Sequence, residues 1–74
     1  MPARQTLSAR QQRRLVEFIE EHLDQELSLA GLATVADISV SHLKTLFRRT
    51  MGMPVHQYVI CRRVERAKTL LLAG

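Results

Sequence analysis

The sequence has few aromatic residues, one cysteine and no long apolar run. With no Trp, one Tyr and two Phe among 74 residues, it lacks the aromatic platforms on which single-stranded nucleic acids usually stack. Cys61 has no second cysteine for an internal disulfide, which favours a reducing compartment and therefore the cytoplasm. No stretch approaches the ~18 apolar residues of a membrane span, and residues 1–12 lack the apolar segment of a signal peptide. We expect a soluble protein with no membrane partner.

The composition is typical of one small folded domain. Hydrophobic residues make up 46% and charged residues 24%, the balance of a globular rather than a disordered chain. A domain of this size buries only roughly 60% of the surface that its unfolded chain exposes, so a large substrate cleft is not expected. No Ser-His-Asp or paired-carboxylate arrangement is evident, and His22, His42, His56 and Cys61 lack the spacing of metal ligands. We expect a binding protein without catalytic residue, cofactor or metal, and not an enzyme.

The charges are divided unevenly between the two halves of the chain. The net charge is +4 and the isoelectric point is near 10.2. Residues 1–37 carry four basic and six acidic side chains, whereas residues 38–74 carry seven basic side chains and one acidic. The seven are Lys44, Arg48, Arg49, Arg62, Arg63, Arg66 and Lys68. A basic half favours a polyanionic partner, and nucleic acid first. Whether Arg62, Arg66 and Lys68 contact phosphates or only keep a helix face solvated stays open.

Apolar side chains recur with helical spacing, and no segment alternates with a period of two, so an all-α fold is predicted. The first helix is expected over about residues 9–24, because Ser8 and Gln11 form a capping-box pattern. Its apolar face holds Leu15, Ile19 and Leu23. Ser28 can cap a short second helix. A narrow apolar stripe on that helix is formed by Leu29, Leu32, Ala33 and Ala36, at positions i, i+3, i+4 and i+7.

A short turn separates the second helix from the third. Asp37 fits this turn, because Asp tolerates the left-handed backbone conformation. Ser39 then caps a helix over about residues 40–50, and Gly52 ends it. The core-facing side chains of this third helix are Leu43, Leu46 and Phe47.

Pro54 fits the first turn of a long fourth helix that reaches about residue 73. Its apolar residues recur at intervals of four, three and four, at Ile60, Val64, Ala67 and Leu71.

The opposite face of the third helix carries polar side chains suited to reading duplex DNA. They are Ser41, Lys44, Thr45 and Arg48, at helical spacing. An α-helix fits the major groove, where Lys and Arg donate to guanine, Ser and Thr hydroxyls donate or accept, and a Thr methyl can meet thymine. Ser39 at the helix start and Arg49 at the edge of this face can hold phosphates. A short helix, a tight turn and such a face indicate a helix-turn-helix.

The stretch LSLAGLATVADISVSHLKTLFRRTMG, residues 27–52, resembles the first helix-turn-helix of the AraC/XylS transcriptional regulators. The shared features are Leu32-Ala33, Ser39, His42-Leu43, Leu46-Phe47-Arg48 and Gly52. The continuation is similar to the connecting helix of that family, through Pro54, Gln57-Tyr58, residues 63–67 and Leu70-Leu71.

This resemblance implies a homeodomain-like helix-turn-helix, with three short helices followed by a long connecting helix. It divides the chain into a tail at 1–7, a helix-turn-helix unit at 8–53 and the connecting helix at 54–74, with the family's second helix-turn-helix unit absent. It implies a sequence-specific transcriptional regulator that inserts helix 40–50 into the major groove of double-stranded DNA. The groove-facing positions of the family fall on Ser41, Lys44 and Thr45, with Arg48 and Arg49 near the DNA backbone. RNA polymerase is a candidate second partner.

Some residues allow a second interpretation. The chain can instead be a small helical interaction or dimerisation module, in which Leu70, Leu71 and Leu72 dock on a partner or on a second copy. We expect His42 to pack or hydrogen-bond at a helix interface. Cys61, beside Arg62, is either a plain small residue or a redox-sensitive thiol.

Overall fold

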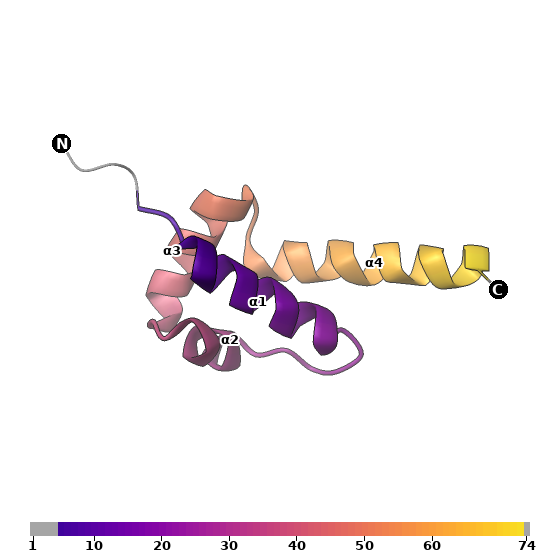
Figure 1. The fold of residues 1–74 in the computed structure, drawn as a ribbon, viewed down its shortest axis with the longest axis horizontal. Coiled ribbons are helices and arrows are strands. Elements are labelled where there is room, and N and C mark those ends of the chain that lie inside the picture. Colours follow the sequence, from indigo (N-terminus) through magenta and orange to yellow (C-terminus); the bar gives the residue numbers. More distant parts are fainter. Residues whose placement is uncertain (1–4, 74) are drawn as a thin grey trace.

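The computed structural model describes residues 5–73, which form four α-helices and, within that range, no strand. The helices are α1 (Ala9–Glu21), α2 (Leu29–Ala36), α3 (Val40–Met51) and α4 (Val55–Ala73). Helices α1 to α3 pack together, and α4 extends from them alone toward the C-terminus (Figure 1). The all-α, homeodomain-like architecture with a long last helix is confirmed. Residues 1–4 of the predicted tail and Gly74 lie outside the described residues.

The first three helices begin at the predicted serines. In α1 the capping box is complete: the Gln11 N–H donates to Ser8 Oγ over 3.1 Å, and the Ser8 N–H donates to Gln11 Oε1 over 3.0 Å. The hydroxyls of Ser28 and Ser39 cap α2 and α3 in the same way, over 3.0 and 3.1 Å. Each cap satisfies an N–H that has no partner within its helix.

Two left-handed residues end α2 and α3 as expected. Asp37 has φ 60 and ψ 45, and it is the one non-Gly residue with positive φ in the described chain. Gly52 has φ 80. A left-handed residue at this position turns the chain out of the helix. The elbow between α2 and α3 is therefore fixed by Asp37.

Helix α1 ends at Glu21, three residues before the predicted end. His22 is the C-cap, and its backbone N–H donates to the carbonyls of Phe18 and Ile19 over 3.2 and 3.1 Å. Its ring Nδ1 also donates to the Phe18 carbonyl over 2.7 Å, and the ring stacks on Phe18 with centroids 4.1 Å apart. Leu23 follows the helix end and is nevertheless buried.

The core lies between α1, α2, α3 and the first turns of α4. Leu43, Leu46 and Phe47 are buried, which confirms the predicted phase of α3. The Tyr58 ring meets the Phe47 ring edge-on, with centroids 5.5 Å apart. Leu7 is also buried, although it falls within the predicted tail, and its N–H donates to Thr50 Oγ1 over 2.8 Å. The core therefore includes Leu7, a residue that precedes α1.

Among residues 55–72 of α4, the buried side chains are Val55 and Val59. The repeat noted in the sequence faces outward, because Ile60 and Val64 are 45% and 48% exposed and Leu71 is 80% exposed. Within the described range, no helix is both long and apolar enough to span a membrane.

Candidate nucleic-acid interface

The structure brings the predicted base-reading residues together on one solvent-exposed face of α3. We call this set the exposed α3 face: Ser41, Lys44, Thr45 and Arg48. The opposite side of the same helix holds the buried Leu43 and Phe47, so the orientation of α3 is set by apolar burial. The side chains of α3 that do not pack in the core therefore point into solvent, on a helix whose diameter fits the major groove of DNA.

Hydrogen bonds restrict what two of the hydroxyls can do. The Thr45 hydroxyl donates to the Ser41 carbonyl over 3.3 Å, which leaves its oxygen as an acceptor and its methyl for apolar contact. The Ser39 hydroxyl accepts from the His42 N–H, so its own proton can still be donated outward. Ser39 therefore caps α3 and still has a hydroxyl proton with which to donate a hydrogen bond to a phosphate oxygen.

Three basic side chains of α3 have no partner among the described residues. Lys44, Arg48 and Arg49 are exposed, and within residues 5–73 none of them forms an ion pair or a side-chain hydrogen bond. Arg48 and Arg49 lie in the last turn of α3, where positive charge is favourable beside the helix dipole. These cations are free for an anion.

The arginines of α4 are used differently. Arg62 donates from Nε and Nη2 to the two carboxylate oxygens of Glu20, over 2.6 and 3.1 Å, and from Nη1 to Glu65 over 2.7 Å. Arg63 donates to the carbonyls of Leu23 and Gln25 over 3.0 and 2.7 Å.

Arg66 donates to the Glu20 carbonyl over 3.2 Å. We call Arg62, Arg63 and Arg66 the arginine cluster. It satisfies carbonyls at and beyond the C-terminal end of α1, where helical carbonyls have no partner of their own. Arg62 and Arg66 therefore bind other parts of the same chain. The sequence had suggested only phosphate contact or solvation of a helix face for these residues. Spacing along α4 gives no signal of these contacts, since the partners lie about forty residues away.

Three groups at or near these contacts have shifted pKa values. The hydrogen bond from Arg62 holds the pKa of the Glu20 carboxyl below its usual value, and Glu20 in turn raises the pKa of Arg62. Burial beside the core raises the pKa of the Tyr58 hydroxyl.

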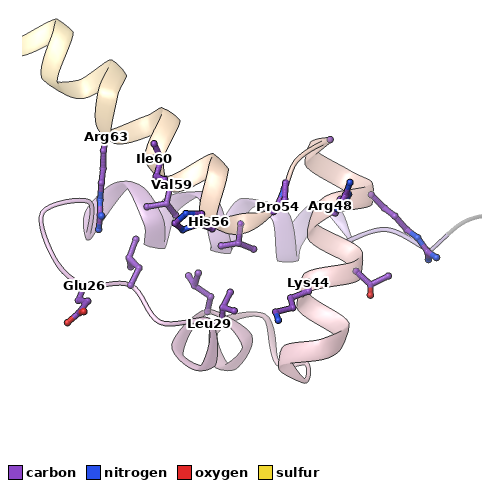
Figure 2. Close-up of a pocket in the computed structure, with 15 residues that line it drawn as sticks. Glu26, Leu29, Lys44, Arg48, Pro54, His56, Val59, Ile60 and Arg63 are labelled. Carbon is purple, nitrogen blue, oxygen red and sulfur yellow. The ribbon is translucent and has the colours of Figure 1, made fainter.

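A groove of about 990 Å³ lies between α4 and the α2–α3 pair. Figure 2 shows Lys44 and Arg48 on its α3 side, Leu29 on α2, and His56 and Ile60 on α4. We call this the α4 groove. It adjoins the exposed α3 face, because Lys44, Thr45 and Arg48 belong to both.

The exposure of His42 and Cys61 bears on two smaller expectations. His42 is exposed, and its ring forms no hydrogen bond among the described residues, so the structure gives no support to the expected role at a helix interface. Cys61 is an exposed free thiol. Within the described chain, no group of three or more His, Cys, Asp or Glu residues is placed to hold a metal ion.

The sequence matches the profile of "Bacterial regulatory helix-turn-helix proteins, AraC family" over residues 19–59, more than half of the chain. The chain belongs to the AraC family. Its match to the probable transcriptional regulator LumQ of Photobacterium leiognathi is 41% identical over 54 residues, or 73% of this chain and 22% of LumQ. The match to the right origin-binding protein of Escherichia coli K12 is 36% identical over 59 residues, or 80% and 20%.

The AraC-family chain thus spans about a fifth of the length of these relatives. No solved structure matches it. Membership places residues 19–59 in a family of DNA-binding regulators, so the alternative of a small helical interaction module is not favoured.

Proposed function

We propose that this AraC-family chain binds duplex DNA by inserting α3 into the major groove, as the DNA-binding part of a transcription regulator in the bacterial cytoplasm. The exposed α3 face would meet base edges, and Ser39 and Arg49 would hold phosphates on either side. The name of the right origin-binding protein supports a DNA partner. RNA polymerase stays a predicted second partner to which we assign no surface.

The observation that carries this proposal is that the arginines of α4 are hydrogen-bonded to other parts of the chain, whereas the basic side chains of α3 are not. The arginine cluster is committed to α1 and the loop after it. The three cations of α3 are exposed and uncommitted in the described chain. Arg10, Arg13 and Arg14 of α1 and Lys68 of α4 are also exposed and form no ion pair within residues 5–73. The three cations of α3 differ from these because they lie on the helix that follows the tight turn, which is the helix of a helix-turn-helix that enters the major groove.

A matched pair of lysine variants tests the proposal. Lys44→Ala removes a cation from the exposed α3 face, and Lys68→Ala removes one from the exposed part of α4. Binding is measured by fluorescence anisotropy on a duplex selected from a random pool. We expect Lys44→Ala to cost about 1–3 kcal/mol on that duplex and Lys68→Ala to change affinity less than about twofold. Equal losses would show that net charge, rather than α3, controls binding.

A single helix-turn-helix makes few phosphate contacts. We therefore expect the 74-residue chain to bind most duplexes within the nonspecific range of about 10⁻⁴–10⁻⁶ M at physiological salt.

We also propose that the chain associates with itself through Leu70, Leu71 and Leu72, whose side chains are 66%, 80% and 88% exposed. Adjacent exposed leucines of this kind are typical of an interaction surface.

A further inference from the structure

The α4 groove contains surface that contact with DNA does not explain. Leu29 of α2 and Val59 and Ile60 of α4 line it, and Ile60 is 45% exposed. Phosphates are hydrated anions and gain nothing from leucine and isoleucine side chains, whereas an apolar partner would gain roughly 25 cal/mol for each Å² removed from water. The floor of the groove therefore favours an occupant with apolar side chains.

The charges around the groove are of one sign with a single exception. Lys44, Arg48 and Arg49 line its α3 side, and Glu26 is the one acidic residue among the described lining residues. Arg63 also lines it, but its guanidinium already donates to two carbonyls. Among the residues that line the groove, the cations without a partner are thus all on α3. An occupant with carboxylates beside its apolar side chains would complement this rim.

The groove has the length of a short helical segment. Its lining runs along α4 from Val55 to Arg63, which is about 12 Å at 1.5 Å per residue, or two turns of a helix. An amphipathic helix presents apolar side chains on one side over two turns and charged ones along its edges.

We propose that the α4 groove binds an acidic amphipathic helix of a protein partner, and that this helix competes with DNA. Its leucine-like side chains lie on Leu29, Val59 and Ile60, and its carboxylates pair with Lys44 and Arg48. Because Lys44, Thr45 and Arg48 also belong to the exposed α3 face, one occupant excludes the other. The competition rests on the proposed DNA binding, whereas the helix site itself does not.

Model peptides test the helix site without DNA. The probe is a labelled 18-residue peptide with Leu at i, i+3, i+4 and i+7 and Glu at the flanking positions. One control replaces each Glu by Lys, and another replaces each Leu by Ser. We expect the acidic Leu peptide to bind at least tenfold more tightly than either control, measured by anisotropy. Absence of binding, or equal binding of the three peptides, overturns the proposal.

Two uncharged substitutions locate the site. Ile60→Gln changes a residue that lines the groove, and Val64→Gln changes an equally exposed residue of α4 that does not line it. We expect Ile60→Gln to weaken binding of the acidic Leu peptide at least fivefold and Val64→Gln to weaken it less than twofold. Circular dichroism confirms that both variants keep their helices. If Val64→Gln weakens binding as much as Ile60→Gln, the peptide sits elsewhere on α4 and the proposal is wrong.

The last arm adds a duplex. The acidic Leu peptide should displace a labelled 20-base-pair duplex from the wild-type chain, and the same displacement from Ile60→Gln should need at least fivefold more peptide. If the peptide binds and the duplex stays bound, the two sites are separate and the proposed competition is wrong. If the peptide binds and no duplex binds even at low salt, the helix site stands and the proposed DNA binding fails.

Discussion

Arg62 of α4 and Glu20 of α1 form a two-point ion pair, with Nε–Oε2 and Nη2–Oε1 distances of 2.6 and 3.1 Å. The pair joins the last turn of α1 to the middle of α4, at a position where α4 has no buried apolar side chain. In the part of α4 that follows Val59, the direction of the helix is thus set by polar contacts to the end of α1. Changes in those contacts should move α4 without disturbing the core.

Acidification should remove the contribution of this pair. Arg62 lowers the pKa of Glu20 in the folded chain, so the pair stabilises fully above the unfolded value of about 4.3 and is lost as pH falls through the folded value. Both side chains are about a third exposed, which limits the effect to less than about 1 kcal/mol. We expect Glu20→Gln to be less stable than wild type at pH 7, by urea unfolding, and this difference to shrink as the pH is lowered below about 4.3. Glu17→Gln, an exposed control on the same helix, should show no such convergence.

Phe47 should be the most costly side chain to truncate. It is 1% exposed and its ring meets Tyr58. Phe47→Ala should lower the free energy of unfolding by about 3–5 kcal/mol, enough to unfold much of so small a domain. Phe18→Ala removes the same ring from a half-buried position and should cost less. Thermal melting compares the two variants, and an unchanged melting temperature for Phe47→Ala would show that the core is not centred on α3.

Local signals in the sequence were sufficient for most of the fold. The caps at Ser28 and Ser39 and the left-handed turn at Asp37 depend on residues within four positions of each other. Helical spacing likewise gave the buried and exposed sides of α3, because burial of Phe47 leaves the opposite side in solvent. The placement of the proposed DNA-reading side chains therefore followed from local pattern alone.

Contacts between distant residues were not predictable in the same way. In the sequence, the arginine cluster cannot be distinguished from a solvated basic helix face, because its partners become neighbours only when α4 lies beside the end of α1. The burial of Leu7 depends on Thr50, which lies 43 positions away. The apolar repeat of α4 was visible, but spacing alone does not say whether Ile60 and Val64 meet a core or solvent. The α4 groove, which needs three helices in place, was not foreseen.

The turn between α2 and α3 should tolerate glycine and reject a β-branched residue. Asp37 adopts φ 60, a conformation that costs a β-branched side chain about 1–3 kcal/mol. We expect Asp37→Val to lower the free energy of unfolding by that amount and Asp37→Gly to stay within about 1 kcal/mol of wild type. Asp24→Val is the control, since Asp24 is exposed in a turn without positive φ. Equal losses from both valine variants would show that the left-handed turn is not the cause.

Arg49 should contribute to DNA affinity without contributing to sequence preference. Its side chain is exposed and unpaired in the described chain, beside the exposed α3 face. Arg49→Ala should weaken binding to all duplexes alike and reduce the slope of log affinity against log salt by about 0.9. Arg66→Ala removes the same side chain from the arginine cluster and should leave the slope unchanged. A loss from Arg49→Ala confined to one sequence would instead assign Arg49 to base reading.

Self-association should depend on the leucines at the end of α4. Leu72 is 88% exposed and lies one residue before the end of α4. The C-terminal part of α4 extends from the other three helices (Figure 1), so burial of Leu72 in a second copy would remove apolar surface from water. Sedimentation of the wild-type chain should show a mass that rises with concentration, and Leu72→Glu should keep it monomeric. Thr69→Glu places the same charge on an exposed neighbour and should associate as the wild type does. If both glutamate variants are monomeric, added charge rather than loss of the leucine explains the effect; a wild-type chain that stays monomeric at every concentration would remove the leucines as an interface.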